Sequence, residues 1–116
     1  MSIFVSGQPS CCNSCKGNIV VTETPTPGST VGVTTAGSNA ATVTFSRNQI
    51  LLSFKIVANG VERPGTLSKV IGYKSTTFTL TPLGPVPVGP LTAFVETYDP
   101  VNDCKRRTRW MWNVST

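Results

Sequence analysis

The strongest constraint on this fold is an alternation of apolar and polar residues, with a period of two, that recurs along the chain. In residues 41–46 the apolar positions are Ala41, Val43 and Phe45. In residues 50–57 the apolar set expected to face the core is Ile50, Leu52, Phe54 and Ile56. Successive side chains of a strand point to opposite faces, so this period predicts half-buried strands. No stretch of about 12 residues carries a helical period, and the chain is therefore predicted to be all-β.

Turn residues separate further stretches of strand-forming residues. Both residues of Asn59-Gly60 tolerate positive φ, so this pair predicts a type I′ hairpin into a return strand. Proline cannot donate to a strand ladder, so Pro25 and Pro27 end a first strand. The remaining strands are predicted at residues 19–24, 31–33, 61–63, 76–80, 91–98 and 107–114.

The inward face is clear for two of these later strands and open for a third. For residues 76–80 the inward set is Thr76, Phe78 and Leu80. For residues 107–114 the inward set is Thr108, Trp110, Trp112 and Val114, and the outward set is Arg107, Arg109, Met111 and Asn113. In residues 91–98 the face stays open, because an inward set of Leu91, Ala93 and Val95 competes with one of Phe94 and Tyr98. The last strand is thus predicted to bury both tryptophans.

Several of these strands resemble those of one family of folds. Residues 41–45 look like the second strand of the fibronectin type III and immunoglobulin-like group, and residues 52–56 look like its third. Residues 77–85 resemble the fifth strand and its corner, and residues 93–98 resemble the sixth. The resemblance implies an all-β, immunoglobulin-like or fibronectin III-like β-sandwich of six to seven strands over residues 18–116. Residues 1–17 are then expected to form an N-terminal arm that carries a cysteine cluster.

The chain offers little that could catalyse a reaction. It has no histidine, which removes the commonest acid-base group and the usual partner of a serine or cysteine nucleophile. Its five carboxylates show no pattern of convergence: Glu23, Glu62, Glu96, Asp99 and Asp103. No glycine-rich phosphate loop occurs. We therefore expect no enzyme, no catalytic residues and no cofactor.

Four cysteines are the sharpest chemical feature: Cys11, Cys12, Cys15 and Cys104. A disulfide from the N-terminal cluster to Cys104 would close a loop of about 90 residues and stabilise the fold by roughly 4 to 5 kcal/mol. Four thiols also match a tetrahedral zinc site, although a second CxxC is missing. Free thiols are the third reading, and the sequence leaves all three open.

The basic residues point to a partner at the C-terminal end of the chain. The formal net charge is +5, and four of the ten basic residues lie close together: Lys105, Arg106, Arg107 and Arg109. With the tryptophans in the core, the arginines are expected to form a basic rim that binds carboxylates. A small nucleic-acid-binding β-barrel that uses Arg106, Arg107 and Arg109 is an alternative function.

A sandwich with an arm and no catalytic set fits adhesion to another surface. The resemblance implies a structural or assembly protein, a decoration or cement protein of a phage capsid, that binds shell subunits. Its arm residues Ile3, Phe4 and Val5 would then join the basic rim in partner binding. We expect a homo-oligomer or multi-copy assembly, no membrane partner, nucleic acid only as a second choice, and a location in the virion after synthesis in the host cytoplasm. A zinc-stabilised module is the third functional hypothesis.

Overall fold

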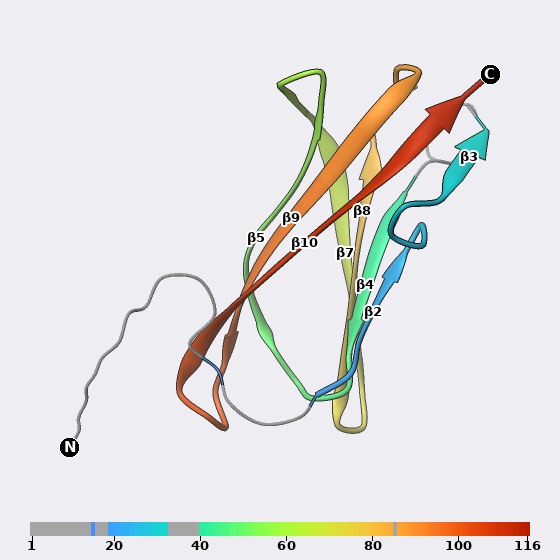
Figure 1. Ribbon diagram of the computed structural model, residues 1–116. Helices are drawn as coiled ribbons and strands as arrows, with labels where there is room; N and C mark the ends of the chain where they lie inside the picture. Colours follow the sequence, from blue (N-terminus) through green and yellow to red (C-terminus); the bar gives the residue numbers. More distant parts are fainter. Residues whose placement is uncertain (1–14, 16–18, 33–39, 85) are drawn as a thin grey trace.

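The computed structural model describes residues 15, 19–32, 40–84 and 86–116. Within them the chain forms nine strands in two layers (Figure 1). Their bounds are β2 Val21–Thr24, β3 Thr30–Gly32, β4 Ala41–Phe45, β5 Ile50–Ala58, β6 Val61–Arg63, β7 Gly65–Gly72, β8 Ser75–Pro82, β9 Gly89–Asp99 and β10 Cys104–Ser115. The predicted all-β sandwich is confirmed. The boundary expected at residue 17 falls outside the described residues and stays a prediction.

The two sheets are connected as in an immunoglobulin-like sandwich. One sheet has five strands in the order β3-β10-β9-β5-β6, and the other has four in the order β2-β4-β8-β7. The four-stranded sheet corresponds to the ABED sheet of that fold. The five-stranded sheet corresponds to its CFG sheet, with β3 and β6 added at the two edges. The chain changes sheets between β2 and β3, where Pro25 and Pro27 stop the first ladder as predicted.

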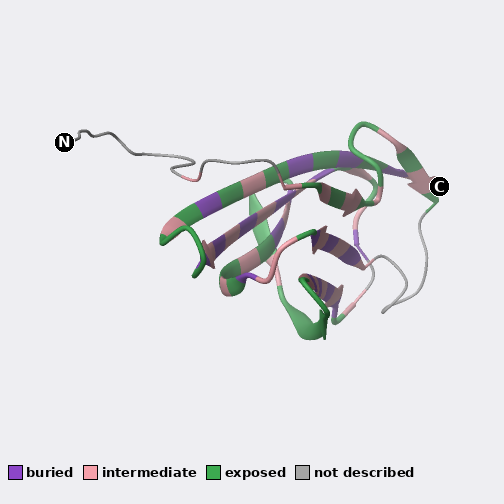
Figure 2. Ribbon diagram, turned by 90° about the horizontal axis from the view of Figure 1, so that it is seen from below, coloured by how far each residue is buried: buried purple, intermediate pink, exposed green. Residues whose placement is uncertain are grey.

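The core lies between the two sheets and follows the alternation of the sequence. Along β4, β8, β9 and β10, buried residues alternate with residues that are partly or fully exposed (Figure 2). Trp110 and Trp112 of β10 are buried, as predicted, with their rings stacked at 6.0 Å between centroids. Phe45 and Phe78 meet edge to face across β4 and β8, with centroids 6.2 Å apart. The core is therefore built from the inward sets of β4 and β8 in one sheet and of β5, β9 and β10 in the other.

The inward face of β9, which the sequence left open, is set by its pairing with β5 and β10. Leu91, Ala93 and Val95 face the core, while Phe94 and Tyr98 face outward. The inward set continues to the end of the strand with Thr97 and Asp99, both fully buried. The last two inward positions of β9 are therefore polar.

The prediction for the first part of β5 is wrong. Ile50 and Leu52 are 53% and 46% exposed, whereas Phe54 and Ile56 face inward as expected. The register between β5 and β9 shifts between Leu51 and Ser53, which marks a β-bulge. One extra residue reverses the faces on one side of it, so the inward residue before the bulge is Leu51, opposite Thr97.

A strand that the sequence did not predict, β7, forms one edge of the four-stranded sheet. It pairs only with β8, and all eight of its residues are exposed. Lys69 lies opposite Phe78, whose side chain faces the core, so Lys69 is on the inward face of this edge strand. β7 thus has a charged side chain where a buried strand would have an apolar one.

The hairpin between β5 and β6 has the turn that its sequence predicts. Asn59 and Gly60 have φ of 53° and 77°, both in the left-handed region. We expect Gly60→Ala to lower the free energy of unfolding by about 1 to 2 kcal/mol, because a Cβ is disfavoured at this φ. Gly84→Ala is the control, since Gly84 has no positive φ and open space around it. Urea unfolding of both variants measures the difference, and equal effects would contradict the conformational explanation.

Candidate functional site

One end of the core is polar, at the hairpin that joins β9 to β10. The inward positions there carry the buried side chains of Gln49, Thr97, Asp99 and Arg106. The Thr97 hydroxyl donates a hydrogen bond of 2.8 Å to Oε1 of Gln49, and the Gln49 backbone amide donates one of 3.2 Å to the Thr76 hydroxyl. We call Asp99, Arg106, Arg47, Cys15 and Cys104 the polar cap, because they close this end of the sandwich.

Asp99 contacts both arginines of the polar cap and two backbone amides of the β9–β10 turn. Its Oδ1 accepts hydrogen bonds from the backbone amides of Val101 and Asn102, at 3.0 and 3.1 Å. Its Oδ2 lies 3.9 Å from Nη1 of Arg47 and 3.9 Å from Nη2 of Arg106. Among the described residues Oδ2 accepts no hydrogen bond, and Nε and Nη2 of Arg106 donate none. Two arginines thus share one buried carboxylate, and its Oδ2 accepts no hydrogen bond from any described residue.

The charges in the polar cap are shifted by burial and by one another. Burial alone raises the pKa of Asp99, but hydrogen bonds from the Asn102 amide, the Gln49 side chain and the Val101 amide, together with Arg47, lower it below its ordinary value. Burial lowers the pKa of Arg106, and Asp99 opposes that shift. The carboxylate is therefore ionised at neutral pH and faces two cations.

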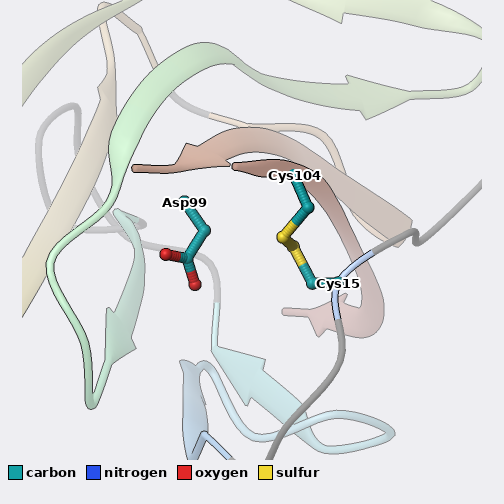
Figure 3. Close-up of side chains that lie close together, drawn as sticks. All are labelled: Cys15, Asp99 and Cys104. Atoms are coloured by element: carbon teal, nitrogen blue, oxygen red, sulfur yellow. A yellow bond between two sulfur atoms is a disulfide. The ribbon is translucent and has the colours of Figure 1, made fainter. Parts of the chain in front are cut away.

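A disulfide joins Cys15 to Cys104 beside this carboxylate (Figure 3). Cys104 pairs with Asp99 across the β9–β10 ladder, so both side chains lie on the same face. The two cysteine Cα atoms are 5.2 Å apart, and the Cys15 sulfur lies 3.4 Å from the backbone oxygen of Lys105. The predicted bridge from the N-terminal cluster to Cys104 is confirmed, and Cys15 is its partner. Cys11 and Cys12 lie outside the described residues.

The cap also brings together atoms that could hold a metal ion. The sulfurs of Cys15 and Cys104 and a carboxylate oxygen of Asp99 lie within 4.8 Å of one another. In the disulfide the two sulfurs are bonded to each other, so only the reduced pair offers thiolates. Tetrahedral zinc takes four protein ligands in a closed site, whereas the described residues supply three. Two thiolates suit a soft ion such as copper(I) better.

The predicted partner-binding residues are divided between the two faces of the five-stranded sheet. Arg107 and Arg109 are exposed on the outer face as expected, whereas Arg106 points inward and is 8% exposed. Arg106 therefore does not contribute to the predicted basic rim, because the strand period places this residue on the inward face, opposite the buried Thr97. Ile3, Phe4 and Val5 lie outside the described residues. Across those that are described, we find no helix with the length and apolar character needed to cross a membrane.

Comparison with known proteins agrees with this class of fold, a two-sheet β-sandwich. A solved structure of PcoC, a methionine-rich copper resistance protein from Escherichia coli, matches with a TM-score of 0.63 and 15% identity over 80% of this chain and 93% of that chain. Selenomethionine PcoC matches with a TM-score of 0.54 and 11% identity over 80% and 95%. No family model and no curated protein matches the sequence. At these identities the likeness shows the fold alone.

These matches correct the predicted function and location. The sequence led us to expect a capsid decoration or cement protein in a virion, whereas both of the solved structures described above are copper resistance proteins. The reason for the error is physical: many unrelated functions share the sandwich, so a resemblance of strands does not identify a site. The expected absence of a metal also lacks support, given the cysteine and aspartate donors of the polar cap. The predicted homo-oligomer or multi-copy assembly stays a prediction.

Proposed function

We propose that this protein is a small, non-enzymatic binding module that holds copper(I) between Cys15 and Cys104 when their disulfide is reduced. The observation that carries the proposal is the approach of both sulfurs and the Asp99 carboxylate to within 4.8 Å, next to two arginines. The likeness to copper resistance proteins supports the choice of copper. PcoC is methionine-rich, whereas this chain has two methionines, so its donors would have to be thiolates.

The charges of the polar cap suit an anionic copper dithiolate. Two thiolates and one copper(I) ion carry a net charge of −1, and ionised Asp99 adds another negative charge. Arg47 and Arg106, each 3.9 Å from Asp99, compensate both. Asp99 would orient the arginines and leave the ion to the sulfurs, since a carboxylate is a hard ligand. A divalent ion bound by the same two thiolates would leave the cap with an excess positive charge.

The disulfide would control when the ion binds. Two equivalents of a small-molecule thiol reduce the bridge, so that their own sulfurs become a disulfide and Cys15 and Cys104 become thiols. Copper(I) then replaces the two thiol protons. A small-molecule disulfide would accept two electrons from the pair and become two thiols, while the Cys15–Cys104 bridge reforms and the ion is released. A bridge of this kind persists where the surroundings are oxidising, so binding would follow the redox state of the compartment.

A titration of the reduced protein with copper(I), in the absence of oxygen and against a chromophoric copper(I) chelator, tests this proposal. We expect one tightly bound ion per chain in the reduced protein and none in the oxidised protein. Cys104→Ser should lose the site, because one thiolate remains. Cys11→Ser/Cys12→Ser keeps both sulfurs of the proposed site and should therefore keep copper binding. Equal copper binding by Cys104→Ser, or stronger binding of zinc than of copper by the reduced protein, would overturn the proposal.

A further inference from the structure

The outer face of the five-stranded sheet gathers basic side chains from two strands, β5 and β10. On β10 the outward positions include Lys105, Arg107 and Arg109, and on β5 the outward residue opposite Phe94 is Lys55. Glu96 is the carboxylate among them, and its Oε2 accepts a hydrogen bond of 3.2 Å from Nε of Arg107. We call this surface the basic face. It lies on the opposite side of the sheet from the polar cap and the core.

The basic face is hollowed. A depression of about 520 Å³ lies over β5, β9 and β10, where the sheet twists. The residues that line it are Ser53, Lys55, Phe94, Val95, Glu96, Arg107, Thr108 and Arg109. Its volume is in the range of sites that hold small ligands. Three cations and one carboxylate thus surround a hollow that contains an aromatic ring.

Phe94 lies in the middle of this surface, between two cations. It pairs with Arg109 on β10 and with Lys55 on β5, and Nζ of Lys55 is 5.8 Å from the centroid of its ring. In the described part of the chain, no ion pair is formed by the side chain of either Lys55 or Arg109. A ring that is partly exposed on a sheet, beside two cations whose charge no described carboxylate compensates, can stack a base while the cations contact the phosphates of the same strand.

We propose that the basic face binds single-stranded nucleic acid. Outward residues along β10 repeat about every 7 Å, two residues at 3.4 Å each, so its cations can follow successive phosphates of an extended strand. The open sheet offers Phe94 to unstacked bases, which a duplex keeps inside. An acidic peptide would match the charge but would leave the aromatic ring without a stacking partner. This inference is independent of copper, because the surface is complete in the oxidised, metal-free chain.

Fluorescence anisotropy of a labelled oligothymidylate of about 12 nucleotides tests the proposal with the oxidised protein. Three phosphate contacts predict a slope of about −2 for the logarithm of affinity against the logarithm of salt concentration. Lys55→Gln/Arg109→Gln should weaken binding about tenfold and bring the slope to about −0.7. Phe94→Leu should weaken binding about fivefold and keep the slope, because it removes stacking and no charge.

Lys69→Gln/Lys74→Gln is the matched control, because it removes the same charge from the other sheet. Both residues are exposed, on β7 and in the turn before β8. Unchanged binding by this control, together with the losses above, supports the proposal. Equal losses in both double variants would show that net charge alone attracts the strand and would overturn it. Competition by polyglutamate as strong as by the oligonucleotide would also overturn it, in favour of an acidic peptide.

Discussion

Serine in place of Cys104 is expected to lower the free energy of unfolding by about 4 to 5 kcal/mol relative to the oxidised protein. The bridge joins residues 89 positions apart in a chain of 116, so it restricts most of the unfolded chain. Its loss increases the entropy of the unfolded state and leaves the inter-sheet core in place. Urea unfolding followed by tryptophan fluorescence measures this change, since Trp110 and Trp112 are buried.

Two comparisons show whether the effect comes from this bridge. The wild-type protein with a thiol reductant should unfold at the same urea concentration as Cys104→Ser, because both lack the cross-link. The slope of free energy against urea should rise in both, since the unfolded chain exposes more surface once the link is gone. Cys11→Ser/Cys12→Ser should behave as the oxidised wild type. A large loss in that variant would place the important bridge elsewhere.

Replacement of Asp99 by asparagine is expected to cost about 3 kcal/mol or more at neutral pH. The variant keeps the shape of the side chain but removes its charge, which leaves two arginines of the polar cap without a counter-ion. The Arg106 side chain is 9% exposed, so water compensates little of that loss. Glu96→Gln is the matched control, because Arg107 in that ion pair is 61% exposed and the loss should stay below about 1 kcal/mol.

The pH dependence of stability provides a second readout for Asp99. Its pKa is lowered in the folded protein, so its contribution is fully present above the pKa of the unfolded chain, about 3.9. The contribution is lost as the pH falls through the lower pKa of the folded state. Urea unfolding between pH about 5 and 2 should therefore show a loss of stability in the wild type that is smaller in Asp99→Asn. Equal slopes in the two proteins would contradict the assignment.

The alternation of the sequence was sufficient for the strands that bury one face. β4, β8 and β10 have the inward sets that were predicted, including both tryptophans. The same alternation gave a wrong or missing prediction at two places. The bulge at Leu52 inserts one residue and reverses the faces before it, and the apolar run 50–52 carries no sign of that insertion. β7 has no buried face, so Gly65–Gly72 lacks the contrast on which the prediction depends.

The candidate site was predicted only in its covalent part. Cys15 and Cys104 were marked by their chemistry, whereas Asp99, Arg47 and Arg106 meet only in three dimensions. One signal was present, because Asp99 follows Leu91, Ala93, Val95 and Thr97 at the period of β9 and so falls on the inward face. That signal required the buried face of β9, which the sequence left ambiguous. The basic face was expected in part, since Arg107 and Arg109 were assigned outward, but Lys55 and Phe94 joined it only through the register of β5.

The inward lysine of β7 has a consequence for solubility. An exposed edge strand with Leu67, Val70 and Ile71 uncovered is a surface on which identical chains can stack into fibrils. A strand added beside β7 would continue the sheet and bring neighbouring apolar side chains around Lys69, whose ammonium group would lose its water. The charge of Lys69 would therefore oppose the ordered addition of further strands at this edge of the sheet.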